Sequence, residues 1–260
     1  MPSENEEKIK AAVEIIKLAY EDAFQPIAKE VGKMGGTIGQ IVNLALEPAR
    51  GVVWGYEETK AYVTHKVTEK LEKRKVKAED IVTPDPDIAV PSIEALRYTK
   101  LKDEFANLIA SAMDKNNSGD IHPSFVDLLK QISPDEALIL KHLTDEGRVI
   151  PFVELRKYFI EEGKEKGFIP IGDNFGDIAK VANCTFPKNL NSYMTNLFRL
   201  GLLEKVDFIK IRDDNTYVQL LSHIEYYGDK YVDSENNEYQ FEKRVFRITE
   251  LGKLFLKYCL

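Results

Sequence analysis

The sequence predicts a mainly helical protein in which long N-terminal helices, packed as a hairpin or bundle, precede a winged-helix-like α+β domain. Three observations support this fold class. Apolar residues recur at three- and four-residue steps through the first half, a proline-rich segment interrupts the helical pattern, and two stretches rich in Val, Ile, Tyr and Phe lie near the end of the chain. We therefore expect an N-terminal helical domain over residues 1–123 and a winged-helix-like domain over residues 124–260.

The first two expected helices are long. An apolar stripe over residues 9–31 predicts one helix, which Pro26 kinks or restarts because proline removes a backbone donor. A glycine-dense stretch over residues 32–39 follows. A second apolar stripe predicts a helix over residues 48–75.

A proline-rich segment separates these helices from the next. TPDPDIAVPS, residues 83–92, holds three prolines in ten residues, and this spacing predicts an extended strap rather than a helix. Ser92 is then expected to cap a third helix that continues to Ala112. The polar cluster DKNNSGD, residues 114–120, ends this helix.

The second half begins with a clear helix start. Ser133 supplies a cap, Pro134 suits the first helical position and Glu136 stands three residues after the cap. The elements that follow are expected as helices over 175–181 and 189–203, strands over 207–227 and 239–248, and a closing helix over 249–256. Helix, helix, longer helix and hairpin is the order of a winged helix-turn-helix.

Composition excludes several classes of protein. The net charge of −7 disfavours a protein whose main task is to coat nucleic acid or anionic lipid. The two cysteines, Cys184 and Cys259, lie far apart, so we expect neither a disulfide framework nor a cysteine zinc site. The polar N-terminus MPSENEEKIK does not resemble a secretory signal, and we expect a cytoplasmic protein.

Catalytic motifs are missing. The sequence contains no G-x-S-x-G, G-x-x-x-x-G-K-[ST] or G-x-G-x-x-G pattern, and none of its four histidines stands three or four residues from another histidine or a cysteine. We therefore expect a non-enzymatic protein without a metal or cofactor. A site assembled from scattered Asp, Glu, Tyr and Lys residues stays open as an alternative.

One segment partly matches a calcium loop. Residues 114–121 place side-chain oxygens at loop positions one, three and five and a glycine at position six. Position twelve, however, is Phe125 instead of a bidentate glutamate, and Pro123 would interrupt the helix that leaves the loop. We therefore interpret the segment as a polar turn that ends a helix.

A weakly charged region lies in the first half. Residues 34–56 carry only two charged side chains, Glu47 and Arg50, and four of their five glycines stand at small-xxx-small spacing. This spacing lets helices approach closely, so it predicts a self-association face made by Gly35, Gly39, Gly51 and Gly55. Membrane insertion is the alternative, but the polar residues, charges and proline within the stretch weaken it as a span.

The expected helix over residues 189–203 offers a second candidate surface. If the winged-helix-like domain binds DNA, the N-terminal end of this helix would present Lys188, Asn189, Asn191 and Ser192 to base edges. Only Lys188 and Arg199 supply positive charge along the helix, whereas specific binders make several phosphate contacts. A protein-interaction module therefore fits this acidic chain better.

Several blocks in the same order resemble one bacterial family. The runs EPARGVVWGYEETKAYV, IAVPSIEALRY, FANLIASAMD, HPSFVDLLKQISPDEALIL and NLFRLGLLE are similar to those of the Abi-alpha (abortive infection alpha) family, a domain of unknown function. This resemblance implies a role in phage exclusion, in which an infected cell halts growth or dies, and it brings no catalytic residue.

Together these features predict a non-enzymatic antiphage or growth-arrest factor that acts through protein contacts and is a homo-oligomer. Two alternatives stay open. One is a winged-helix regulator that binds DNA, and the other is a membrane-perturbing effector that uses residues 34–56.

Overall fold

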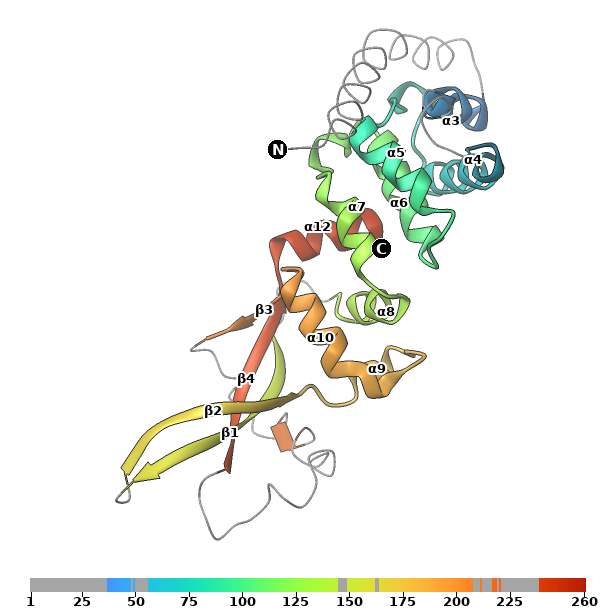
Figure 1. Cartoon of the computed structure of the whole chain (residues 1–260). Coiled ribbons are helices and arrows are strands. Elements are labelled where there is room, and N and C mark those ends of the chain that lie inside the picture. Colours follow the sequence, from blue (N-terminus) through green and yellow to red (C-terminus); the bar gives the residue numbers. More distant parts are fainter. Residues whose placement is uncertain are drawn as a thin grey trace, which may run out of the picture. The chain divides into compact units, whose positions relative to one another are not determined.

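The computed structural model describes residues 37–47, 49, 56–144, 149–161, 164–207, 211, 217–218, 220 and 239–260. The chain forms two compact units (Figure 1). The first contains the described residues up to Gln131 together with Lys257–Leu260, and the second is Ile132–Leu256. The helix expected over residues 9–31 lies outside the described residues. The domain boundary expected between residues 123 and 124 stays a prediction.

Helices make up the first unit. They are α3 (Ile38–Leu46), α4 (Tyr56–Lys73), α5 (Pro86–Ala95), α6 (Lys102–Met113) and α7 (Ser124–Gln131), with short 3-10 turns η2 (Ala78–Asp80) and η3 (Ser118–Asp120). Helix α6 packs against α4, α5 and α7, and α3 packs against α4. The C-terminal half of α6, residues 108–113, is buried throughout, so this helix forms the centre of the unit.

The proline-rich segment is helical, and the predicted strap over 83–92 is wrong. Asp85 caps α5 by accepting a hydrogen bond from the backbone N–H of Asp87 (2.8 Å), and Pro86 stands in the first turn, where its missing N–H costs nothing. Pro91 alone interrupts the helix interior. Burial of Ile88 and its neighbours Ala89, Ser92 and Ile93 offsets the lost hydrogen bond.

The third helix was also expected to be continuous from Ser92, and it is not. Helix α5 ends at Ala95, and a turn precedes the start of α6 at Lys102. Ser92 is buried within α5 and caps nothing. The predicted end of this helix at the polar cluster is confirmed, because α6 stops at Met113.

The last turn of helix α12 (Glu250–Cys259) belongs to the first unit. The Ser111 hydroxyl donates to the backbone carbonyl of Tyr258 (2.9 Å), and the Asn107 amide donates to the carbonyl of Cys259 (3.2 Å). The Tyr258 hydroxyl donates to Asp120 (2.6 Å). Side chains of α6 thus satisfy two carbonyls that the end of a helix leaves without partners.

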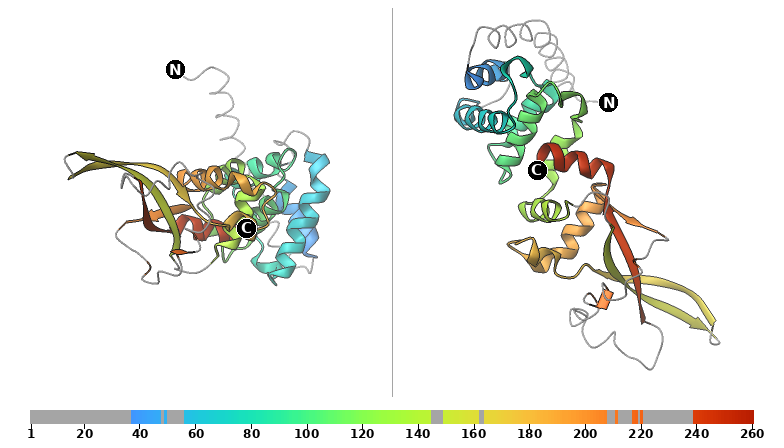
Figure 2. Two further views of the ribbon diagram at one scale, coloured as in Figure 1. Left: turned by 90° about the horizontal axis from the view of Figure 1, so that it is seen from below. Right: turned by 180° about the vertical axis from the view of Figure 1, so that it is seen from behind.

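The second unit is mixed α+β. Its elements are α8 (Pro134–His142), β1 (Ile150–Glu161), β2 (Lys164–Asn174), α9 (Ile178–Val181), η4 (Pro187–Asn189), α10 (Leu190–Arg199), β3 (Leu203–Val206), β4 (Tyr239–Ile248) and the first part of α12. The strands form one antiparallel sheet in the order β2-β1-β4-β3. The far half of the β1–β2 hairpin extends away from α8, α9 and α10 (Figure 2).

Aromatic side chains form the core of this unit on one face of the sheet. Phe152 of β1 stacks on Phe175 (ring centroids 5.2 Å apart), and both rings contact Phe246 of β4. Phe198 of α10 completes the cluster against Phe175 and Phe246. Val153 points to the opposite face, because successive strand residues alternate, and there it packs with Tyr217, Leu220 and Phe241.

Several predicted elements of the second unit are confirmed. Ser133 and Glu136 form the predicted capping box at the start of α8, and β4 and α12 lie where they were expected. The helix expected over 189–203 is shorter than predicted, since α10 ends at Arg199 and Gly201 turns the chain with a φ of 69°. The helix expected over 175–181 is limited to Ile178–Val181.

One expectation about the sheet is wrong, and one hairpin was missed. The strand predicted over 207–227 does not form at the residues described there, because Tyr217, Val218 and Leu220 are helical and the strand β3 comes earlier, at Leu203–Val206. The β1–β2 hairpin over residues 150–174 was not predicted. The fold is therefore helix-rich α+β with a sheet larger than the sequence indicated.

Candidate binding surfaces

Helix α10 presents a polar stripe to solvent. Ser192, Thr195 and Arg199 are exposed, and their steps of three and four residues place them on one side of the helix. Lys188, in the 3-10 turn η4 that precedes α10, is also exposed. The opposite side buries Met194 and Leu197 against the rest of the unit. The stripe is therefore the outer face of an amphipathic helix.

The predicted nucleic-acid contacts lie at the beginning of this stripe. Lys188 and Asn189 belong to η4, and both are exposed. Asn191 and Ser192 stand in the first turn of α10, where Asn191 is half-buried and Ser192 is exposed. The structure thus brings the four residues together at one end of α10. Their role in nucleic-acid binding stays a prediction.

Arg199 and Asn196 connect the far end of the stripe to α8. The Arg199 guanidinium donates twice to Asn196 Oδ1, through Nε (3.1 Å) and Nη2 (2.7 Å). The Asn196 amide donates in turn to Glu136 Oε1 (2.7 Å), and the other oxygen of Glu136 accepts the backbone N–H of Ser133 (2.6 Å). One carboxylate therefore caps α8 and fixes α10.

Asp135 holds the other end of α10. Its buried carboxylate accepts hydrogen bonds from the backbone N–H groups of Thr185 (2.8 Å) and Phe186 (2.9 Å) and from the Tyr193 hydroxyl (2.8 Å). Burial alone would raise the pKa of Asp135, but these hydrogen bonds to the charged form outweigh it and hold the pKa below its ordinary value. The segment before α10 is thus tied to α8 by a buried anion.

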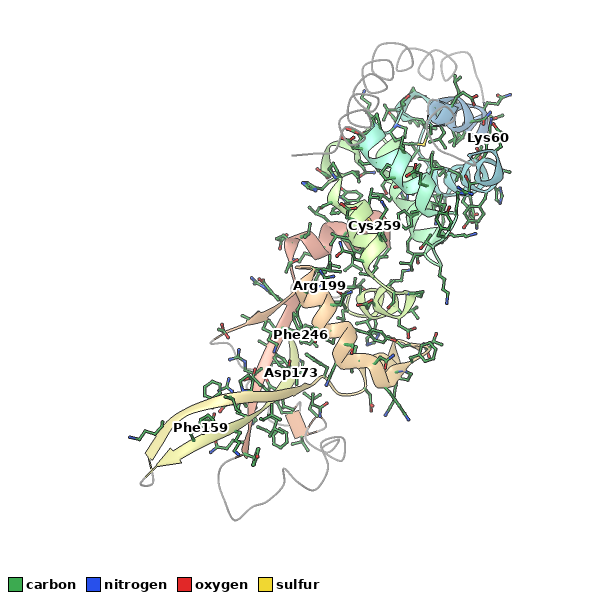
Figure 3. The ribbon with its side chains drawn as sticks, in the orientation of Figure 1. Lys60, Phe159, Asp173, Arg199, Phe246 and Cys259 are labelled. Carbon is green, nitrogen blue, oxygen red and sulfur yellow. The ribbon has the colours of Figure 1, made fainter. Side chains whose placement is uncertain are left out.

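A second surface lies on the far half of the β1–β2 hairpin, which we call the hairpin arm (residues 156–161 and 164–171). Four large apolar side chains are exposed there, namely Phe159 (48%), Phe168 (44%), Ile169 (44%) and Ile171 (38%). Phe159 is far from Phe246, which marks the aromatic core (Figure 3). The exposed side chains therefore contribute nothing to that core.

Both faces of the hairpin arm combine aromatic and cationic groups. Tyr158 and Phe168 are cross-strand partners with ring centroids 5.5 Å apart, and the Arg156 guanidinium lies 4.0 Å from the Phe168 ring centre. On the other face, the Lys157 ammonium lies 5.5 Å from the ring centre of Tyr239. These contacts hold the arm in a defined conformation.

At the base of the arm, ionisable groups from three strands pair with one another. Glu154 of β1 is buried, and it accepts a hydrogen bond from Arg156 Nε (2.5 Å). Lys205 of β3 reaches Asp173 of β2 (2.8 Å) and lies 3.9 Å from Glu154. The charges neutralise each other, as expected of an ion-pair network that supports the sheet.

The glycine-spaced region is only partly described. Gly39 lies in α3, where an added Cβ would stand 3.7 Å from the Thr68 hydroxyl of α4, so this glycine faces a helix of the same chain. Gly35, Gly51 and Gly55 lie outside the described residues. The self-association face stays a prediction. Among the described residues, every helix is too short or too polar to cross a membrane.

The partial calcium loop is a self-contained turn. The Asp114 carboxylate accepts hydrogen bonds from the backbone N–H of Asn116 (3.0 Å) and the amide of Asn117 (2.6 Å). In the described part of the chain, no three His, Cys, Asp or Glu side chains are grouped so that they could hold a metal ion. His122, which precedes the next helix, accepts the backbone N–H of Ser124 (3.1 Å) through Nδ1, as a capping side chain does.

Two further features of the sequence point to these surfaces. The stretch of 26 residues over 178–203 contains no acidic residue, although 43 of the 260 residues in the chain are Asp or Glu. It carries Lys180, Lys188 and Arg199. The second signal is YFI and GFIPI, residues 158–160 and 167–171, two apolar runs on either side of a short charged segment. This pattern is typical of a hairpin.

The fold and its surfaces define the class of this protein, which is a helix-rich α+β protein with two exposed surfaces. They point to no particular reaction. Residues 59–259 match the model of a family described as abortive infection alpha, and because this match covers most of the chain, the protein belongs to that family. The resemblance seen in the sequence is confirmed.

Other comparisons add little. No curated protein matches the sequence. A solved structure described as an uncharacterized protein from the hydrocarbon-degrading marine bacterium Alcanivorax borkumensis SK2 matches 52% of this chain and 90% of its own at 16% identity, with a TM-score of 0.29. A likeness at this level supports no conclusion on fold or function.

Proposed function

We propose that this protein is a cytoplasmic antiphage factor of the abortive-infection type that acts without catalysis, through protein contacts that include self-association. Membership of the abortive infection alpha family supports the biological role. The observation that carries the proposed mode of action is the hairpin arm, because it exposes four large apolar side chains. Phe159 and Ile169 lie on the same face of the arm, because Phe159 pairs with Gly167 and Ile169 with Lys157. Exposed apolar side chains grouped in this way are typical of interaction sites.

The energetics favour a protein partner for the hairpin arm. Removing one large apolar side chain from water stabilises a complex by about 1.5–3 kcal/mol when burial is complete. Phe159 and Phe168 are each about half exposed, so each has roughly half of that free energy left to gain on binding. The network of Arg156, Glu154 and Lys205 fixes the base of the arm, so little ordering is needed on association.

Phage challenge tests this proposal. Cells that express the Phe159→Ser/Ile169→Thr variant should lose the protection that the unchanged protein gives, measured as the efficiency of plaque formation. The matched control is Tyr98→Ser, which removes an aromatic side chain that is 78% exposed in the first unit and should leave protection intact. Circular dichroism melts of both variants establish that they are folded. Full protection by the folded double variant would refute the role of the hairpin arm.

Light scattering after size exclusion tests self-association directly. The unchanged protein should show a mass that rises with concentration, and the Phe159→Ser/Ile169→Thr variant should stay monomeric. A monomeric unchanged protein would overturn the self-association part of the proposal.

The membrane-perturbing alternative uses residues 34–56. In α3, the apolar side chains of Ile41, Val42, Ala45 and Leu46 are buried in the first unit, and exposing them to lipid would require α3 to leave its packing on α4. This arrangement supports the protein-contact proposal instead. Dye release from liposomes by the purified protein would favour the membrane alternative.

A further inference from the structure

We propose that the hairpin arm of each copy docks on the turn between α9 and η4 of a second copy, so that two chains form a reciprocal dimer. The docking site on the second copy, which we call the turn patch, consists of Val181 and Phe186. This inference rests on the self-association in the proposed function, and it names the surface that the hairpin arm contacts.

The turn patch is apolar and exposed. Phe186 is 63% exposed and Val181 is 58% exposed, and no other large apolar side chain in the described part of the second unit is exposed as much. Val181 ends α9 and Phe186 directly precedes η4, so the two residues stand on either side of one short turn. Apolar side chains grouped in this way on a folded domain are typical of a protein contact.

Hydrogen bonds fix the backbone of this turn. The buried Asp135 carboxylate accepts the backbone N–H groups of Thr185 (2.8 Å) and Phe186 (2.9 Å). The backbone N–H of Cys184 donates to the carbonyl of Ala179 (2.9 Å). The turn patch is therefore preorganised, and less conformational entropy is lost when a partner binds.

The hairpin arm lies far from the turn patch of its own copy. The far half of the β1–β2 hairpin and α9 are on opposite sides of the second unit (Figures 1 and 2). A contact between the two surfaces therefore needs two molecules. A two-fold axis between two copies places each arm on the turn of the other copy and closes the assembly.

The area of the hairpin arm favours a second copy over an unrelated protein. Its four large apolar side chains are 38–48% exposed, so one arm offers roughly 300 Å² of apolar surface. An unrelated protein that covered one arm completely would bury about 600 Å² in total, whereas a stable interface needs about 1,200–2,000 Å². In a reciprocal dimer, each copy gives one arm and receives one. The buried area then doubles to about 1,200 Å², which reaches the required range.

The chemistry of the hairpin arm favours protein over lipid. Residues 161–166, where β1 and β2 meet, have the sequence EEGKEK and carry five charges. This charged end would enter a bilayer first, and charged side chains are costly in the hydrocarbon region. A protein surface can instead cover the apolar side chains beside the charged end and leave the charges in water.

Mixing two variants of the full chain tests the reciprocal dimer. The arm variant Phe159→Ser/Ile169→Thr keeps the turn patch, and the patch variant Val181→Ser/Phe186→Ser keeps the arm. Alone, each variant should dimerise about a hundredfold more weakly than the unchanged protein, because neither forms an intact contact with itself. An equal mixture should form a heterodimer about tenfold tighter than either variant alone, because one of its two contacts is intact.

Analytical ultracentrifugation with a fluorophore on the arm variant measures these dissociation constants. All four substituted side chains are exposed, and circular dichroism melts establish that both variants are folded. Tyr98→Ser, which changes an exposed aromatic side chain in the first unit, is the matched control and should dimerise as the unchanged protein does. The mass of the unchanged protein should stop rising at two chains.

The outcomes separate this inference from the proposed function. If the unchanged protein dimerises but the mixture forms no heterodimer, the arm does not dock on the turn patch, although self-association stands. A mass beyond two chains would overturn the closed dimer. A monomeric unchanged protein at about 100 μM would overturn both proposals and assign the arm to a different protein. Flotation with vesicles of phosphatidylethanolamine and phosphatidylglycerol that is lost in the arm variant would assign the arm to lipid instead.

Discussion

At the scale of single residues, helix α12 depends on one glycine. An added Cβ at Gly252 would stand 2.2 Å from the backbone carbonyl oxygen of Leu202 and 2.7 Å from a methyl group of Ile248. A backbone atom cannot move aside as a flexible side chain can, so α12 and the chain before β3 approach as closely as they do only because residue 252 lacks a side chain.

Gly252→Ala should therefore destabilise the protein. Helix propensity alone would favour alanine by about 0.5–1 kcal/mol, but overpacking in a filled interior costs about 1–3 kcal/mol or more. We expect a net loss in the free energy of unfolding, measured by urea denaturation. Gly119→Ala is the control, because an added Cβ there meets no atom within 4 Å. Equal stability of the two variants would contradict the reported contact.

Asp135 should make stability depend on pH. Its pKa is held below the ordinary value in the folded protein, so its contribution is complete above the unfolded-state pKa of about 3.9 and is lost as the pH falls through the lower, folded value. Asp135→Asn should remove this contribution to the pH dependence. The free energy of unfolding of this variant, measured from pH 6 downward, should therefore fall less steeply than that of the unchanged protein. At neutral pH, the variant should lose about 1–3 kcal/mol because donors are left with a weaker acceptor.

The free energy of unfolding at neutral pH also distinguishes the buried Asp135 from an exposed aspartate, Asp177. Asp177→Asn is the control, because Asp177 pairs with Lys180 near the surface and that ion pair is well exposed. This variant should lose less than about 1 kcal/mol. An acid slope that Asp135→Asn leaves unchanged would show that this carboxylate is not the responsible group.

At the scale of elements, the proline-rich segment shows where sequence reasoning succeeds and where it fails. Counting prolines predicted a strap, but α5 forms because Pro86 occupies the first turn and only Pro91 breaks the interior hydrogen-bond ladder. The cap visible at Ser133 predicted a helix start correctly, whereas the one expected at Ser92 lies inside α5. The β1–β2 hairpin was missed because its stability depends on pairing with β4, which is distant in the sequence.

Replacing Pro91, the interior proline of α5, should stabilise the protein. A proline in a helix interior costs about 3 kcal/mol relative to alanine, and its missing N–H leaves the carbonyl four residues earlier without a helical partner. Pro91→Ala should therefore raise the free energy of unfolding by about 1–3 kcal/mol. Pro86→Ala, in the first turn, should be neutral or slightly destabilising. A destabilised Pro91→Ala variant would mean that the ring of Pro91 contributes packing that outweighs its cost.

The candidate binding surfaces were partly predictable at this scale. The sequence placed Lys188, Asn189, Asn191 and Ser192 at the start of a helix, and the structure has them at the beginning of α10; their role in binding stays a prediction. The anchoring of α10 by Asp135 and Glu136 was not predicted, since the sequence showed the two acids only as part of a helix start. Their hydrogen bonds to residues about 50 to 60 positions later depend on the tertiary fold.

At the scale of the whole molecule, the chain leaves the first unit at Gln131 and returns to it at Lys257. The returning residues complete that unit, because Asn107, Ser111 and Asp120 all bond to the last turn of α12. Two compact units were expected from the sequence. The return of the chain to the first unit was not expected, because nothing in the composition of residues 257–260 distinguishes them from an ordinary helix end.

Deletion of residues 257–260 should therefore weaken the first unit, although the rest of α12 belongs to the second. The three lost hydrogen bonds are worth about 0.5–1.5 kcal/mol each, and loss of the buried Tyr258 and Cys259 side chains adds to this. Hydrogen exchange should increase in α6 more than in β4. Lys253→Gln, an exposed change in the same helix, should leave exchange in α6 unchanged. Unaltered protection of α6 after the deletion would contradict this account.

The return of the chain to its first unit has a consequence during synthesis. Residues 257–260 emerge from the ribosome only after all of Ile132–Leu256 has been made, so the first unit stays unfinished throughout translation of the second. A nascent chain that stalls within Ile132–Leu256 lacks the last turn of α12, which packs beside α6. The last turn of α12 thus joins the first unit only at the end of synthesis, when Tyr258 and Cys259 bond to α6.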